Sequence, residues 1–178
     1  MRIKYVKDGE QYTIGSFQGK DLIWETIAYF FDEDNRKISR LVLLKDTLST
    51  EPFHKEAENA TWNNSTLRKW LNNTLYKSFS DDDKQRIILQ KQQIRTTLYN
   101  GVTITDETED YIFILSPDEM ICCFDEGIPV QGKFWLRTGG TKSREAFCYD
   151  NGTFRTEEIN SNKIDVRPAM WVMIETEK

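Results

Sequence analysis

The sequence predicts one α+β domain over residues 1–178, with a mixed or antiparallel twisted sheet and two central helices. Segments rich in aromatic and β-branched residues open and close the chain, and the clearest helical periodicity lies between them. Strands, then helices, then strands again indicate an α+β fold rather than a repeating βαβ pattern. Hydrophobic residues make up 38% of the chain and aromatic residues 12%, so we expect a packed core rather than disorder.

The first third of the chain predicts three strands. Residues 12–17 and 22–31 are rich in strand-forming residues, and the turn-forming Gly19 separates them. A polar turn at 32–35 then leads to a third strand at 38–44. Both longer strands end in largely apolar residues, so we expect them to be covered on two faces in places.

The middle of the chain predicts two helices. Asn64 or Ser65 is suited to accept the free amides at the start of the first helix. The second follows Ser80, whose hydroxyl and the aspartates after it suit a helix N-terminus, and it is expected to turn Ile87 and Ile88 inward. Asn72 is expected on the polar side of the first helix. The expected inner face of that helix comprises Leu67, Trp70, Leu71, Thr74, Leu75 and Ser78.

A short strand at 110–115 leads into a third, short helix. Ser116 suits its N-cap, Pro117 its first position, and Glu119 can complete a capping box. The side chains that this helix is expected to place in the core are those of Met120, Ile121 and Phe124.

The last third returns to strands. Asp150-Asn151-Gly152 is a strong hairpin turn between two of them. Pro168 predicts that the final strand is bulged or begins at an edge. The strands are expected at residues 134–137, 146–149, 153–155 and 166–174.

Six segments in this order resemble a bacterial domain-of-unknown-function family, number 6273 in that series, common in gut bacteria. They are Ile14–Phe17, Leu43–Lys45, Thr61-Trp-Asn-Asn-Ser-Thr-Leu-Arg-Lys-Trp-Leu-Asn72, Phe113–Ser116, Trp135–Arg137 and Val166–Ala169. The resemblance spans about residues 12–174. It implies a topology similar to the C-type-lectin-like and formylglycine-generating-enzyme-like folds, in which a terminal strand pairs back to the first.

No catalytic residue, cofactor or metal site is expected. The single histidine, His54, lies in a polar segment and is expected at the surface. Cys122, Cys123 and Cys148 have neither a disulfide pattern nor zinc spacing, so buried reduced thiols are expected. Formylglycine-type metal chemistry needs a pair of cysteines placed to bind the metal, and nothing in the sequence favours pairing Cys148 with either of the others. The acidic residues 106–110 are interpreted as a solvated loop.

The arginines suggest the best candidate binding site. Arg68, Arg137 and Arg167 lie in the resembling segments near tryptophans, where they predict either internal braces or a pocket for an anionic or sugar-like ligand. A binding face is expected between residues 137 and 163, including the polar stretch that follows Gly139-Gly140. The candidate ligand-binding residues are Trp135, Arg137, Arg144, Tyr149, Asn151 and Arg167.

Charge and hydropathy narrow the function classes. A net charge of −5 argues against a nucleic-acid partner, and Arg36, Lys37 and Arg40 are interpreted as a solvated hairpin tip. No apolar run approaches the roughly 20 residues of a membrane span. The start lacks a secretory signal, so a cytoplasmic location is expected, or a secreted or surface location if a leader was removed.

These observations predict a non-enzymatic recognition module that binds a protein or a glycan through its C-terminal loops. One alternative is an enzyme or accessory subunit related to the formylglycine-generating folds. A further alternative is a phage-associated or structural display domain.

Overall fold

The computed structural model describes residues 3–32, 37–56, 60–97, 103–139 and 145–173. Its largest element is a seven-stranded sheet with the order β1-β3-β4-β12-β5, in which β2 also pairs with β3 and β8 with β12. All of these pairs are antiparallel, as in the two smaller sheets. The strands of the main sheet are β1 (Ile3–Tyr5), β2 (Gln11–Phe17), β3 (Lys20–Asp32), β4 (Lys37–Leu44), β5 (Ile87–Ile88), β8 (Phe113–Ile114) and β12 (Pro168–Met173).

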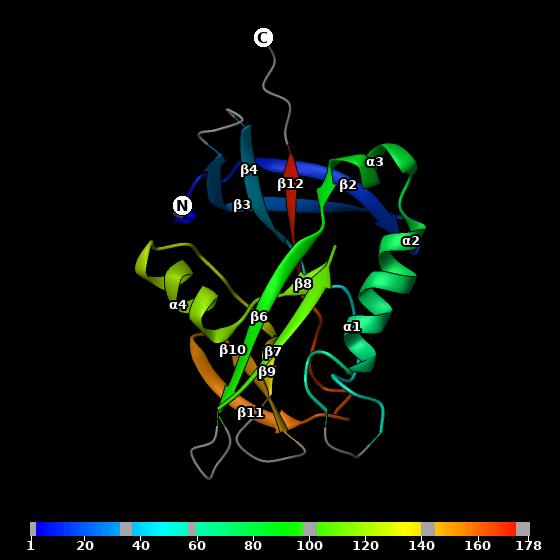
Figure 1. The fold of residues 1–178 in the computed structure, drawn as a ribbon, viewed down its shortest axis with the longest axis vertical. Coiled ribbons are helices and arrows are strands. Elements are labelled where there is room, and N and C mark those ends of the chain that lie inside the picture. The colour runs from blue at the N-terminus through cyan, green and yellow to red at the C-terminus, as the bar shows by residue number, and fades with distance from the viewer. Residues whose placement is uncertain (1–2, 33–36, 57–59, 98–102, 140–144, 174–178) are drawn as a thin grey trace.

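A three-stranded sheet in the order β11-β10-β9 lies at the opposite end of the molecule (Figure 1). It comprises β9 (Lys133–Gly139), β10 (Glu145–Asp150) and β11 (Thr153–Glu158), and we call it the C-terminal sheet. The turn at residues 151–152 joins β10 to β11, with both residues at positive φ, which confirms the predicted hairpin. A separate two-stranded ribbon, β6 (Gln90–Thr97) with β7 (Thr103–Asp110), runs from below the main sheet and passes in front of the C-terminal sheet in the view of Figure 1.

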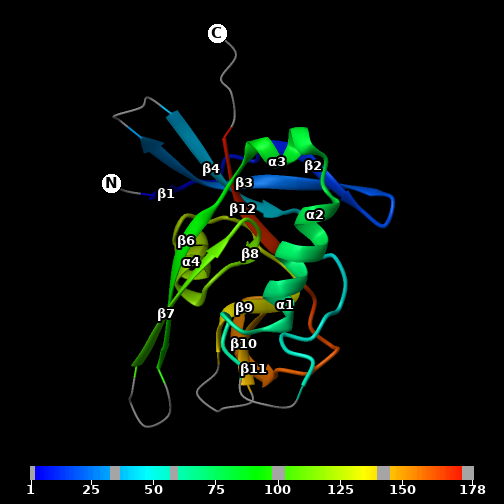
Figure 2. The same ribbon diagram turned by 45° about the vertical axis from the view of Figure 1, so that its right-hand side comes forward.

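One helical segment runs along the side of the molecule from the C-terminal sheet to the main sheet (Figures 1 and 2). It consists of α1 (Thr66–Trp70), the π-helical stretch η1 (Leu71–Leu75) and α2 (Tyr76–Ser78). Leu67, Leu71 and Leu75 are buried, as their spacing predicts, whereas Thr74 and Ser78 are exposed. Two short helices complete the fold, α3 (Asp81–Arg86) and α4 (Pro117–Asp125).

The structure confirms the α+β class and corrects several elements. The second helix ends at Arg86, and Ile87 and Ile88 form strand β5, where they pair with β12. Ile121 on α4 is 45% exposed instead of in the core, while Met120 on the same helix is fully buried. The acidic residues 106–110 belong to β7 rather than to a loop.

The terminal strand begins at Pro168. Proline is tolerated at the first residue of a strand. This strand, β12, pairs with β4, β5 and β8 rather than with the first strand. That detail differs from the expected pairing back to the first strand. The likeness to the C-type-lectin-like and formylglycine-generating folds stays a prediction.

The β2 strand meets the helical side of the molecule at a bulge. The register shifts between Thr13 and Ser16, and Gly15 inside this bulge has a φ of +71°. The ring of Phe79 occupies the space where a side chain on Gly15 would lie, so glycine permits both the backbone conformation and the close contact.

Candidate functional site

The predicted site residues of the C-terminal sheet lie in the interior. Trp135 is fully buried, and its indole Nε1 donates to the carbonyl of Glu51 at 2.8 Å. The hydroxyl of Tyr149 is also used internally, since it donates to the carbonyl of Val130 at 2.8 Å. These two polar groups therefore hold loop backbone to the sheet.

Arg137 is 5% exposed and connects β9 to the start of α4. Its Nη1 donates to the carbonyl of Ile114 at 2.7 Å, and its Nη2 lies 3.0 Å from the Glu119 carboxylate. The same Glu119 oxygen accepts the amide of Ser116 at 2.7 Å and so completes the predicted capping box of α4. Arg137 thus fixes the point at which strand β8 passes into helix α4.

Arg167 is also 5% exposed and holds three carbonyls from two distant segments. Its guanidinium donates to the carbonyls of Leu44 and Lys45, at the end of β4, and to that of Gln131 before β9, all within 2.8–2.9 Å. It also lies over the ring of Phe134. Burial lowers the pKa of Arg167 from its ordinary value, because removal from water disfavours the charged form.

The remaining predicted site residues differ in position. Asn151 is exposed at the β10–β11 turn, where its side-chain oxygen accepts the amide of Gly132 at 2.9 Å. Arg144 lies outside the described residues. Trp135, Arg137 and Arg167 present almost no surface to a ligand, which supports their interpretation as internal braces. Among the described candidates, Asn151 alone is exposed.

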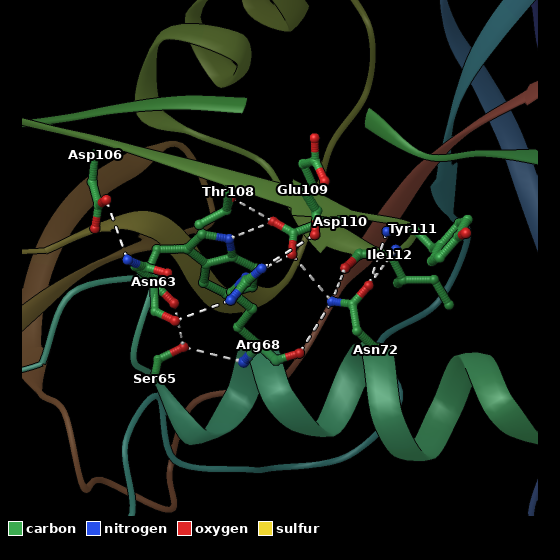
Figure 3. Close-up of polar contacts among 11 residues, drawn as sticks. Asn63, Ser65, Arg68, Asn72, Asp106, Thr108, Glu109, Asp110, Tyr111 and Ile112 are labelled. Carbon is green, nitrogen blue, oxygen red and sulfur yellow. Dashed lines mark hydrogen bonds and ion pairs between the residues drawn. The ribbon is translucent and has the colours of Figure 1, made fainter. Parts of the chain in front are cut away.

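The most connected polar cluster in the described chain centres on Asp110, the last residue of β7 (Figure 3). Its carboxylate is fully buried, yet it accepts hydrogen bonds on both oxygens. One oxygen accepts from Trp62 Nε1 at 2.9 Å and from the Thr108 hydroxyl at 2.7 Å. The other accepts from Arg68 Nε at 2.6 Å and from the Asn72 amide at 3.4 Å. A buried carboxylate is tolerated only when it is paired and hydrogen-bonded in this way.

The helix start positions the partners of Asp110. The hydroxyl of Ser65 accepts the amide of Arg68 at 3.1 Å and acts as the N-cap of α1, as one of the two predicted alternatives. Arg68 then reaches across to β7, where its two terminal nitrogens donate to the carbonyls of Asn63 and Glu109. This side chain therefore joins the helix, the segment before it and the ribbon.

Asn72 faces inward, in contrast to the prediction that it lies on the polar side of the helix. Its side-chain oxygen accepts the amides of Tyr111 and Ile112 at 2.9 and 3.2 Å, and its amide nitrogen donates to the carbonyl of Ile112 at 2.9 Å. The side chain thereby satisfies the backbone of the connection that leaves β7. Asn72 lies in the π-helical stretch, an irregularity that is common at functional positions.

Sequence reasoning did not identify Asp110, because the run of acidic residues around it resembles a solvated surface. A weak signal was present, since an arginine such as Arg68 in the middle of a helix motif often pairs with a carboxylate. Alternation along β7 also separates Asp110 and Thr108, which are buried, from Glu107 and Glu109, which are exposed. Glu107 pairs on the outer face with Lys91 at 2.8 Å, and this contact lowers the pKa of Glu107.

The titratable candidates outside this cluster are structural. His54 is 7% exposed rather than at the surface, and its Nδ1 accepts the amide of Thr66 at 3.2 Å at the start of α1. Cys123 and Cys148 are buried and Cys122 is half-buried, and all three are free thiols. Burial raises the pKa of Cys123 to about 12 and also raises the pKa of Cys148.

Arg40, predicted at a solvated hairpin tip, lies within β4 instead. It pairs with Asp8 at 3.3 Å and with Glu10, and it contacts the hydroxyl of Tyr29 at 2.9 Å. Within the described ranges, no His, Cys, Asp and Glu side chains gather in a way that could hold a metal ion. No helix in those ranges is long and apolar enough to cross a membrane.

The protein is thus an antiparallel α+β domain in which buried charged side chains hold distant segments of its own backbone together. A family model described as a domain of unknown function, DUF6273, matches residues 38–174, and the chain therefore belongs to this family. The match begins at β4, later than residue 12, where the sequence resemblance was placed. No curated protein and no solved structure matches the chain.

Proposed function

We propose that the chain is a non-enzymatic recognition module that binds a protein or glycan ligand through β11 and the β10–β11 turn. The proposal rests on a difference between two groups of polar side chains, one buried and one exposed. Arg137 and Arg167 in the family segments are turned inward onto backbone carbonyls. The outer strand of the C-terminal sheet instead presents its polar side chains to solvent, namely Thr153, Arg155, Thr156 and Glu158.

The internal braces support binding because they hold the binding surface in one conformation. Arg167 ties the segment before β9 to the end of β4, and Arg137 ties β9 to β8. A surface on a braced sheet loses little conformational freedom on binding, which favours affinity. Loops and strand edges carried by a rigid scaffold are common sites of recognition.

The chemistry of the surface favours a polar ligand. Arg155 is well exposed, and its Nε lies 3.5 Å from a carboxylate oxygen of Asp150. The surface therefore presents a guanidinium next to a carboxylate. The threonine hydroxyls and the Asn151 side chain add donors and acceptors at the same edge. Such a set suits the hydroxyl groups of a glycan or the backbone and polar side chains of a protein. A display domain with the same exposed face would use the same surface.

The enzyme alternative is less well supported by the placement of the thiols. On β10, Tyr149 points toward α4, where its ring packs against Phe124. The neighbouring Cys148 therefore points to the opposite face of the sheet, away from Cys123 on α4. Burial raises the pKa of both thiols and so disfavours the thiolate form that binds a metal.

The test uses two probes, a glycan array and a displayed peptide library. The purified chain is expected to select a glycan or a peptide. The double variant Arg155→Ala/Thr156→Ala should weaken that binding by about tenfold or more, as expected for loss of a charged hydrogen bond. Lys69→Ala, at an exposed position on α1, is the matched control and should bind as the parent does. Failure of both probes to select a ligand, or equal binding by the double variant, would contradict the proposal.

A further inference from the structure

We propose that the β6–β7 ribbon is a cover that opens as one unit, that the Asp110 cluster holds it closed, and that its opening exposes Trp62. This inference does not depend on the proposed function. It follows from how the ribbon is attached to the rest of the molecule.

The ribbon pairs with no third strand in the described part of the chain. Its own two strands are fully paired over eight residues each, from Gln90 with Asp110 to Thr97 with Thr103. Movement of the ribbon away from the body therefore breaks no other sheet. It leaves an isolated two-stranded hairpin, which is only marginally stable in water and so exchanges its amides readily. Segments that can separate without breaking a sheet are typical units of local opening.

The inward face of the ribbon is mostly polar. Its described buried side chains are Gln92, Ile94, Thr108 and Asp110, of which only Ile94 is apolar. Hydrophobic burial therefore contributes less to the closed state than it does for a strand of the main sheet, such as β12 with five buried residues in a row. The Nε2 of Gln92 is buried without a hydrogen-bond partner in the closed state, which destabilises that state further.

The contacts that hold the ribbon closed converge on one carboxylate. Asp110 accepts a hydrogen bond from Arg68 on α1 (Figure 3). It also accepts one from Trp62, in the segment before that helix. Two further contacts from this side are exposed to solvent, the hydrogen bond from Arg68 Nη2 to the Glu109 carbonyl at 3.1 Å and that from Asn63 to Asp106 at 3.2 Å. Exposed hydrogen bonds contribute little net stability, so Asp110 is the contact on which closure depends.

Aromatic side chains lie beneath the ribbon. Trp62 is fully buried, and its ring packs against Phe53 at a centroid distance of 6.1 Å. Phe53 in turn packs against Trp135 of β9 at 5.9 Å, and β6 lies beside β9. Loss of the Asp110 contact would leave the indole N–H of Trp62 unpaired and open one end of this aromatic row to solvent. Trp135, predicted as a binding residue and buried in this structure, belongs to the same row.

Hydrogen exchange measured by mass spectrometry on the full chain tests the proposal. Amides of β6 and β7 are expected to exchange together and faster than those of β3 and β12. Asp110→Asn should accelerate exchange in the ribbon by about tenfold or more, because it removes the charge from a buried hydrogen-bonded pair, and should leave β3 and β12 nearly unchanged. Glu109→Gln, on the adjacent exposed side chain, is the matched control and should exchange as the parent does.

A second variant tests the proposal even if Asp110→Asn fails to fold. Gln92→Met removes the unpartnered amide while nearly preserving its volume, and it should slow exchange of the ribbon amides relative to the parent. Exchange of the ribbon at the same rate as β12 in the parent would overturn the proposal. Equal acceleration of the ribbon and β12 by Asp110→Asn, or no slowing by Gln92→Met, would also overturn it.

Discussion

The buried charges of Arg137, Arg167 and Asp110 are each compensated by polar groups in direct contact. Arg167 donates to three carbonyls, and Arg137 combines one carbonyl with the Glu119 carboxylate. Asp110 instead collects side-chain donors from the helix and from β7. In each case the charge is compensated locally, which is the condition under which a buried ion is stable.

Cys123 gives a residue-scale prediction about alkaline pH. Burial raises its pKa from 9.0 to about 12, so the thiol ionises at a lower pH in the unfolded chain than in the folded protein. The free energy of unfolding should therefore fall as pH rises from about 9 to about 12, and Tyr5 and Tyr12, whose pKa values are also raised by burial, act in the same direction. Denaturant unfolding at several pH values measures this decline.

Cys123→Ala removes one titrating group and should flatten the decline. Cys122→Ala, at the half-buried neighbour, is the matched control and should change the slope less. Identical pH profiles for the parent and Cys123→Ala would show that the buried thiol is not linked to folding.

Elements with strong local signals were predictable from the sequence, whereas the ribbon was not. The capping box at Ser116 and Glu119 and the turn at residues 151–152 depend on neighbouring residues alone, and both are confirmed. The ribbon turns Gln92, Thr108 and Asp110 inward, so its burial pattern leaves no apolar alternation in the sequence. The sequence did not predict the Asp110 cluster, because Asp110 acquires its partners on the helical side only through tertiary contacts.

The contact between β2 and the helical side of the molecule gives an element-scale prediction. Gly15→Ala should destabilise the fold by about 2–4 kcal/mol, since it adds backbone strain at positive φ and a clash with the Phe79 ring. Gly19→Ala has a similar φ of +76° with open space around it, so it should cost only the backbone strain of about 1–2 kcal/mol. Urea unfolding of both variants separates the two effects. Equal losses in the free energy of unfolding would show that the Phe79 ring adds no cost at Gly15.

The two sheets, the ribbon and the helical segment share one hydrophobic core, and long-range polar contacts also join them. Arg167 connects β12 with the ends of two segments more than 30 residues away in each case, and the Asp110 cluster joins residues about 40 positions apart. The α+β class follows from local patterns, whereas the partners of the few buried charged residues are set by tertiary contacts and could not be predicted from the sequence. The surface proposed for recognition lies on the outer strand of the C-terminal sheet.

The central claim is that the arginines of the family segments are internal braces and that the polar side chains of β11 form the recognition surface. The free energy of unfolding of three variants tests it most directly. Arg137→Met and Arg167→Met should each lose about 2–4 kcal/mol, because each leaves buried acceptors without a donor. Arg155→Ala, at an exposed position, should stay within about 0.5 kcal/mol of the parent. Parent-like stability of Arg137→Met and Arg167→Met would contradict the account, since residues of a ligand site can be replaced without loss of stability.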